Sequence, residues 1–167
     1  MEKQLFVGEL APCEEHIRPV VNDVLNKPLG GLWTSTYINA ATGSDWVVWS
    51  TSVYNKYEKP VNSYLLTASK DAKIIHVNSM EDFDRLLEKY PLEEGTNGIP
   101  LLPMFDSLLD YEALSKDYDA FHFTRKALTE AKMSLKHMSL GSFDCESTVW
   151  FRWCFDEVEI LDKCYYK

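Results

Sequence analysis

Two segments that lie far apart in the chain carry the side chains best suited to chemistry. The first runs from Lys27 to Thr36, where Gly30 and Gly31 lead into the hydroxyl residues Thr34-Ser35-Thr36. Glycine accepts positive φ and lets the backbone approach another molecule, and hydroxyls at a strand end donate hydrogen bonds to polar groups. This pattern is typical of a strand that holds a ligand, and a turn leading into a core strand explains the glycines equally well.

The second segment is the acidic cluster Asp144-Cys145-Glu146, which opens a predicted strand rich in aromatic and β-branched residues. At the period of two that a strand imposes, Asp144 and Glu146 point to the same face. Two carboxylates on one face can stabilise a developing positive charge or orient a hydroxyl, and Ser147-Thr148 follows directly. The plainer interpretation is the solvated start of a strand, where acidic residues are common.

Other chemical patterns give weaker signals. The four cysteines have no C-x-x-C spacing and no histidine pair near them, so we expect free thiols in a reducing cytosol and no metal site. The sequence has no Gly-x-Ser-x-Gly, Walker or Rossmann glycine pattern, which argues against hydrolase, NTPase and dehydrogenase activity. His76 and His122 are interpreted as satisfied strand histidines, and His137 is expected to be exposed. Cys145 is a candidate nucleophile without an identified base.

The charge balance limits the class of partner. With 17 basic and 26 acidic residues the net charge is −9, which argues against sequence-independent binding to nucleic-acid phosphates. Because the acids are spread along the chain, solubility is their expected role, and mimicry of nucleic acid is the alternative. The 167 residues fit one domain, 1–167. A signal-peptide pattern and an apolar run approaching the roughly 20 residues that cross a bilayer are both missing, so we expect a cytoplasmic protein without membrane partners.

The elements that must position these side chains follow from periodicity. We expect strands at residues 4–10, 31–37, 63–68, 72–77, 118–123, 145–155 and 158–161. Helices are expected at 17–25, at 46–53 with an aromatic core face, at 80–90 after the cap Ser79, at 110–116, and within the polar segment 124–136. The strands at 63–68 and 72–77 are predicted to form a hairpin, and residues 91–104 an irregular loop of a length typical of lids. The whole pattern predicts an α+β protein with segregated antiparallel strands.

Several blocks, taken in order, resemble a known family. They are Gly30-Gly31-Leu32-Trp33-Thr34-Ser35, Ser44-Asp45-Trp46 with Trp49, Asp110-Tyr111-Glu112 with Tyr118-Asp119-Ala120, and Phe143-Asp144-Cys145-Glu146-Ser147-Thr148-Val149. The blocks resemble those of small, uncharacterised phage and bacterial proteins. Their layout is in turn similar to the ADP-ribosyltransferase fold, in which a first strand, a hydroxyl strand and an acidic strand surround NAD. The resemblance covers most of residues 27–151 and implies split antiparallel sheets with flanking helices.

The resemblance also implies roles for individual residues. Glu146 resembles the glutamate of the acid-x-Glu motif, so it would bind the nicotinamide ribose hydroxyls of NAD and stabilise an oxocarbenium-like transition state. Asp144 would orient the acceptor. An aromatic ring would stack on the cationic nicotinamide, a contact worth roughly 0.5 to 2 kcal/mol. The implied cofactor-binding residues are Trp33, Thr34, Ser35 and one or more of Tyr37, Trp46 and Trp49.

One position departs from that superfamily. Its first strand usually presents Arg or His before a glycine to hold NAD, whereas Val7 precedes Gly8 here. His16, Arg18 or Lys27 would have to substitute, and each is otherwise a plain surface residue.

Two functions therefore stay open. One is an NAD-dependent ADP-ribosyltransferase, expected to be phage-encoded and to modify a protein or nucleic acid of the bacterial host. The alternative is a non-catalytic acidic phage protein that inhibits a host factor, for example a defence system, by direct binding. A toxin or immunity component is a third interpretation, which the sequence does not separate from the first.

Overall fold

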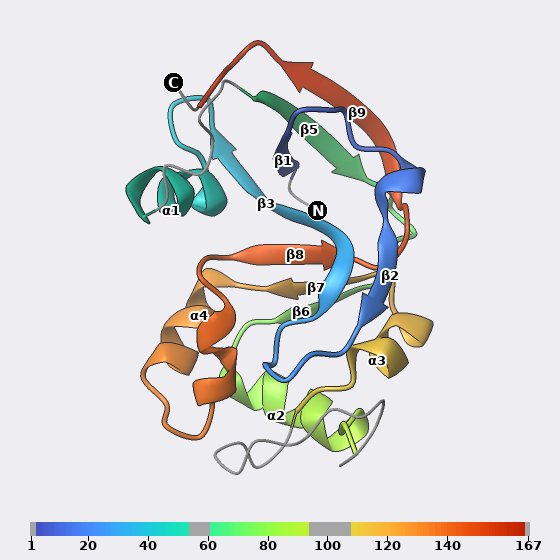
Figure 1. The fold of residues 1–167 in the computed structure, drawn as a ribbon, viewed down its shortest axis with the longest axis vertical. Helices are drawn as coiled ribbons and strands as arrows, with labels where there is room; N and C mark the ends of the chain where they lie inside the picture. The colour runs from blue at the N-terminus through green and yellow to red at the C-terminus, as the bar shows by residue number, and fades with distance from the viewer. Residues whose placement is uncertain (1–2, 54–60, 94–107, 166–167) are drawn as a thin grey trace.

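The computed structural model describes residues 3–53, 61–93 and 108–165 (Figure 1). The strands are β1 Gln4–Gly8, β2 Arg18–Val21, β3 Leu29–Asn39, β4 Gly43–Ser44, β5 Asn62–Ala68, β6 Ile74–Val77, β7 Ala120–Phe123, β8 Ser147–Trp150 and β9 Phe155–Leu161. The helices are α1 Asp45–Val53, α2 Met80–Lys89, α3 Tyr111–Asp117 and α4 Arg125–Lys132, with short 3-10 helices η1 Glu14–His16 and η3 Met138–Ser142. The expected α+β architecture is confirmed.

The strands form one mixed sheet, whose main path runs β6-β7-β8-β3-β1-β5-β9. The short strands β2 and β4 both pair with β3. Among the described strands every pairing is antiparallel except that of β6 with β7, which are parallel. The prediction of antiparallel strands is wrong for this pair, because the chain between them is long enough for a crossover that includes α2 and α3.

Strand β3 is shared by the two parts of the sheet. Its first half pairs with β8, where Thr34 lies opposite Thr148, and its second half pairs with β1, where Thr36 lies opposite Gln4. In Figure 1, β6, β7 and β8 lie on one side of this junction and β1, β5 and β9 on the other. The hydroxyl residues of β3 therefore stand where the two parts meet.

The glycine pair of β3 serves strand packing. Gly30 and Gly31 have φ of 78° and 66°. A Cβ on Gly30 would lie 2.1 Å from the carbonyl oxygen of Pro19, and one on Gly31 would lie 2.5 Å from Cγ2 of Val149. These distances are too short for a side chain, so β2 and β8 approach β3 closely because glycine stands there. The structure accounts for the pair by this packing, without a ligand.

Hydrophobic clusters cover the two parts of the sheet. The largest packs β6, β7 and β8 against the helices and includes Phe83, Leu114, Phe121, Phe123, Leu128, Phe143 and Val149. A second lies around β1, α1 and β5 and includes Leu5, Val7, Val47, Val61 and Leu65. The third joins strands of both parts through Leu32, Tyr64, Leu66, Ala120, Trp150 and Phe155. Burial on this scale fixes the junction in place.

Two local predictions are wrong. Residues 17–25 form β2 and an irregular turn in place of a helix, because Pro19 and the β-branched pair Val20-Val21 favour extended backbone beside β3. The predicted hairpin of 63–68 with 72–77 does not form, since β5 pairs with β1 and β9 while β6 pairs with β7 at the other end of the sheet. The tight turn that suggested a hairpin exists, with the Ala72 N–H donating to the Ser69 carbonyl, and it leads the chain between the two parts.

The other four helix predictions are confirmed in position, at α1, α2, α3 and α4. Ser79, Asp110 and Thr124 cap α2, α3 and α4 by accepting backbone N–H groups. The aromatic core face predicted for α1 is wrong, because the buried residues of this helix are Val47 and Ser50. Residues 94–104 of the predicted 91–104 loop lie outside the described residues.

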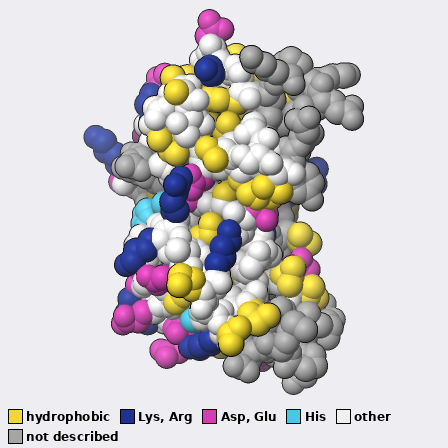
Figure 2. All heavy atoms as spheres, turned by 90° about the vertical axis from the view of Figure 1, so that its left-hand side faces the viewer, with side chains coloured by type: hydrophobic (Ala, Val, Ile, Leu, Met, Phe, Trp, Pro, Cys, Tyr) yellow, Lys and Arg dark blue, Asp and Glu magenta, His cyan; other side chains and the backbone are white. Residues whose placement is uncertain are grey.

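Charged side chains of both signs are mixed on the surface. Figure 2 shows basic and acidic side chains interspersed over the face that carries α1 and α4, rather than gathered by sign. No helix within the described ranges is long and apolar enough to cross a membrane.

Candidate functional site

The carboxylate of Glu146 is the centre of the candidate site. It precedes β8, is only 6% exposed, and receives hydrogen bonds from β3 and β7. The Ser35 hydroxyl donates to Oε2 at 2.6 Å and the Thr36 N–H to the same oxygen at 2.9 Å. The Thr36 hydroxyl lies 2.9 Å from Oε1, and Nε2 of His122 lies 2.8 Å from it. Each carboxylate oxygen thus meets two donors from other strands.

These contacts keep Glu146 ionised. Burial raises the pKa of its carboxyl, but the hydrogen bonds from His122, Ser35 and Thr36, together with the charge that His122 can carry, outweigh burial and hold the pKa below its ordinary value. The site therefore presents a fixed negative charge in a largely dry environment.

The hydroxyls of β3 are themselves held by neighbours. The Thr34 hydroxyl donates to Oε1 of Gln4 at 2.7 Å and accepts from the Trp150 indole at 2.9 Å, and Nε2 of Gln4 lies 3.3 Å from the Thr36 hydroxyl. The Ser35 hydroxyl also accepts the Trp46 N–H of α1, at 3.4 Å. This buried network links β1, β3 and β8, so the orientation of the hydroxyls depends on both parts of the sheet.

Asp144 and Glu146 do not share a strand face as predicted. The strand begins only at Ser147, and Cys145 lies in a bend, so the alternation of a strand does not apply to the two acids. Asp144 instead turns to Lys27, with 3.5 Å between its Oδ2 and the Lys27 Nζ. The same ammonium donates to the Ser142 carbonyl at 3.0 Å and lies 5.4 Å from the centre of the Trp33 ring.

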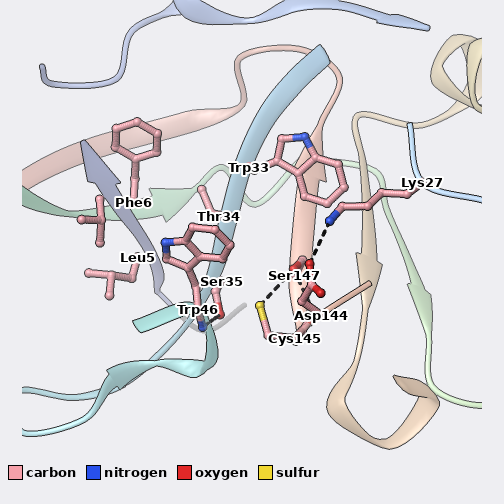
Figure 3. Close-up of a pocket in the computed structure, with 11 residues that line it drawn as sticks. Leu5, Phe6, Lys27, Trp33, Thr34, Ser35, Trp46, Asp144, Cys145 and Ser147 are labelled. Carbon is pink, nitrogen blue, oxygen red and sulfur yellow. Dashed lines mark hydrogen bonds and ion pairs between the residues drawn. The ribbon is translucent and has the colours of Figure 1, made fainter. Parts of the chain in front are cut away.

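A cavity of about 340 Å³ opens beside these groups (Figure 3). We call it the tryptophan cavity; its lining residues are Leu5, Phe6, Val7, Lys27, Trp33, Thr34, Ser35, Trp46, Asp144, Cys145 and Ser147. In Figure 3 the ring of Trp46 lies across from Lys27 and Asp144, and the ring of Trp33 lies next to Lys27. Its volume is at the lower end of the roughly 300 to 1,000 Å³ of small-molecule sites. It suits one ring with an attached sugar better than a whole dinucleotide.

No family model, curated protein or solved structure matches the chain. The function must therefore be argued from this geometry.

Most of the residues singled out from the sequence lie together. Trp33, Thr34, Ser35, Trp46 and Asp144 line one cavity, and Glu146 bonds directly to Ser35. Tyr37 does not join them: it pairs with Ser44 of β4 and packs against the hydrophobic cluster around β1, α1 and β5. Trp49 lies against Trp46, with 5.2 Å between the ring centres.

The β1 position at which the resemblance implies Arg or His holds Val7, and its surroundings are apolar. Val7 belongs to the hydrophobic cluster of β1 and also lines the tryptophan cavity. Of the three suggested substitutes, Lys27 is a lining residue of the cavity, and its charge is already paired with Asp144.

The contacts of the histidines differ most from those predicted from the sequence. His122 and His76, interpreted as strand residues without function, form a chain to Glu146 in which their Nδ1 atoms lie 2.9 Å apart. His137, expected to be exposed, is buried and bonds to Asp84 at 2.9 Å. A usable signal for His122 was present: it alternates with Phe121 and Phe123, so it must face away from the core that they fill.

Two other expectations can be placed. None of the four cysteines, all of which the structure describes, forms a disulfide. Burial raises the pKa of the Cys145 thiol to about 11, so it is a poor nucleophile near neutral pH. The described residues contain no group of three or more His, Cys, Asp and Glu side chains placed to hold a metal ion.

Proposed function

We propose that this protein is an ADP-ribosyltransferase-like domain that uses NAD to modify a macromolecule, expected to belong to a bacterial host. The observation that carries the proposal is the direct contact between Ser35 and Glu146 at the edge of a cavity walled by Trp33 and Trp46. An adjacent trio of strands also supports it, because first strand β1 pairs with hydroxyl strand β3, which pairs with β8, the strand after Glu146. This is the layout that the resemblance implies.

The residues of the cavity fit one half of NAD better than the other. Trp33 and Trp46 offer aromatic faces to a cationic ring, and Glu146, which accepts from the lining residue Ser35, offers a buried negative charge. The diphosphate half finds a single cation in the cavity lining, Lys27, which must loosen its pair with Asp144 to meet it. We therefore expect weak NAD affinity that depends mainly on the nicotinamide end.

The chemistry follows from the placement of charge. Bound NAD supplies an ADP-ribosyl group whose bond to nicotinamide weakens as positive charge develops on the ribose. A fixed carboxylate held by four donors favours that charge without having to reorganise, which is how preorganised groups accelerate reactions. Asp144, which lines the cavity and pairs with Lys27, would orient an incoming acceptor.

The hydrogen bonding of Glu146 sets a condition on this role. A carboxylate offers about four lone-pair sites, and four donors of the protein already occupy them. A ribose hydroxyl can bond to Glu146 only when one donor moves away. Ser35 is the candidate, because its hydroxyl also lines the cavity and can turn to the ligand.

Labelled NAD incubated with the protein and a bacterial lysate tests the proposal. We expect label transfer by the wild type and by Glu157→Gln, which removes an exposed carboxyl on β9, but not by Glu146→Gln. Because Glu146→Gln alters a buried network, Trp46→Ala serves as a second variant. It removes a partly exposed ring and should weaken NAD binding by about 2- to 30-fold. Absence of label transfer, NAD loss and NAD binding in the wild type would overturn the proposal.

The second candidate is a non-catalytic protein that inhibits a host factor by direct binding. The apolar side chain of Val7 in the cavity wall favours it, since the resemblance to ADP-ribosyltransferases implies Arg or His at that position. A stoichiometric host protein or nucleic acid captured equally by the wild type and by Glu146→Gln, with no NAD consumed, supports this function. Loss of inhibition in that variant contradicts it.

A further inference from the structure

The residues that hydrogen-bond to Glu146 line two different cavities. Ser35 lines the tryptophan cavity, whereas Thr36 and His122, which bond to Oε1 of the same carboxylate, line a second cavity of about 470 Å³. We call this the histidine cavity; its lining residues are Gln4, Thr36, Ala68, Ser69, Lys70, Ala72, Ile74, His76 and His122. Glu146 itself lines neither cavity, but its hydrogen-bond partners face both, and on the second side these partners include His122, which contacts His76.

The parallel pairing of β6 and β7 creates the imidazole pair. It places His76 directly opposite His122, with ring centres 5.1 Å apart and Nδ1 atoms 2.9 Å apart. At that distance one Nδ1 must carry a hydrogen and the other must accept it, because two N–H groups or two lone pairs would repel. His122 also holds its Nε2 2.8 Å from an oxygen of Glu146.

These distances restrict the protons of the pair. A lone pair on Nε2 of His122 would face an ionised carboxylate, so this nitrogen carries a hydrogen. When His122 is neutral, its Nδ1 is therefore the acceptor and His76 donates from Nδ1. When His122 is charged, it donates from both nitrogens, and Nδ1 of His76 accepts. A second added proton would put hydrogens on both Nδ1 atoms and break their contact.

We propose that His122 is a positioning residue for Glu146. By hydrogen bonding to Nδ1 of His122, His76 keeps the Nε2–H of His122 directed at the carboxylate. The pair takes up no more than one extra proton. In both allowed states the carboxylate keeps the same donor on Oε1. The orientation of Glu146 is thereby independent of whether the pair is charged. Its ionisation is reinforced when the proton is bound.

The other charged groups around the pair agree with this assignment. Lys70 lines the histidine cavity beside His76, and Cys145, which adjoins Glu146 in the chain, stays protonated because burial raises its pKa. Burial, and then the charge on His122, lower the pKa of His76. An added proton on His122 would lie next to the carboxylate that balances its charge, with Nε2 2.8 Å from Oε1, whereas burial opposes a charge on His76.

The consequence for catalysis rests on the proposed function. If Glu146 stabilises charge on a ribose, then loss of His122 should lower kcat more than it raises KM for NAD, because His122 bonds to Glu146 and lines the other cavity. The positioning itself does not depend on NAD and can be measured without it.

Long-range proton–nitrogen NMR of the histidine rings tests the positioning directly. At a pH where both rings are neutral, we expect the Nε2–H form of His122 and the Nδ1–H form of His76, which is the less common tautomer in water. An Nδ1–H form of His122 would overturn the inference, and so would an Nε2–H form of His76 under these conditions. Either outcome is independent of whether NAD binds.

Titration of the Glu146 side chain by carbon NMR supplies the mutational test. Replacement His122→Leu should raise the titration midpoint of Glu146 by about one pH unit or more, and His122→Gln, which keeps an N–H donor, should restore part of the shift. The matched control is His137→Gln, which alters the separate His137–Asp84 pair and should leave Glu146 unchanged. An unchanged midpoint in His122→Leu would refute the positioning role, whereas unchanged NAD chemistry with a shifted midpoint would count against the proposed function alone.

Discussion

Replacing Ser35 by alanine tests the hydrogen bond between Ser35 and Glu146 at the centre of the site. Ser35 is 1% exposed, and its hydroxyl donates to the ionised Glu146 at 2.6 Å. A hydrogen bond to a charged group contributes about 1.5 to 3 kcal/mol, so Ser35→Ala should lower the free energy of unfolding at pH 7 by that amount. For a chain of 167 residues this corresponds to a fall in Tm of roughly 3 to 12 °C.

A double-mutant cycle separates this bond from other effects of the substitution. Urea denaturation of the wild type, Ser35→Ala, Glu146→Gln and the double variant should give a coupling free energy above about 1 kcal/mol, because the hydroxyl and carboxylate contact each other. Ser52→Ala is the control, since that exposed hydroxyl bonds only to the backbone of its own helix and should change stability by less than about 0.5 kcal/mol. Additive losses for Ser35 and Glu146 would refute the reasoning.

Three further predictions follow from the same structure. Because the folded pKa of Glu146 lies below its ordinary value, its contribution to stability is complete above that value and is lost as pH falls through the lower folded pKa; acid denaturation should therefore be less steep in Glu146→Gln than in the wild type. Gly31→Ala should destabilise the fold by more than about 1 kcal/mol in urea denaturation, since its Cβ would strike Val149 at a positive φ, and a neutral result would contradict the packing role of this glycine. With a pKa of about 11, Cys145 should react with iodoacetamide at pH 8 about two orders of magnitude more slowly than the exposed Cys164, as mass spectrometry of the labelled chain can show.

Sequence periodicity located the elements better than it located their partners. The helix caps Ser79, Asp110 and Thr124 act within three residues, so local patterns are enough to find them. The pairing of β6 with β7 joins residues that are 46 positions apart, as in the contact of His76 with His122, and no local pattern specifies it. The helix predicted at 17–25 is wrong because its apolar spacing is also compatible with a strand, and Pro19, which can stand at a helix start, here lies in β2 beside β3.

The site was partly accessible for the same reason. Residue types marked Ser35 and Glu146 as candidates, and their contact bridges 111 positions of chain. The role of His122 was not predicted because it comes from His76 on β6 and from Glu146, which directly precedes β8. Only the order of the strands in the sheet brings these residues together. Asp144 was assigned to the wrong geometry, since a bend at Cys145 cannot be distinguished by alternation from an early start of the strand.

The distance in sequence between Ser35 and Glu146 also has a meaning for the biology of synthesis. The chain carries the Ser35 hydroxyl 111 positions before the Glu146 carboxylate, and β9, which pairs with β5 in the sheet, follows Glu146 in the chain. When a nascent chain has reached β5, the hydroxyls of β3 therefore still lack the carboxylate that accepts from them. The junction between the two parts of the sheet gains its Ser35–Glu146 contact only after Glu146 has been synthesised.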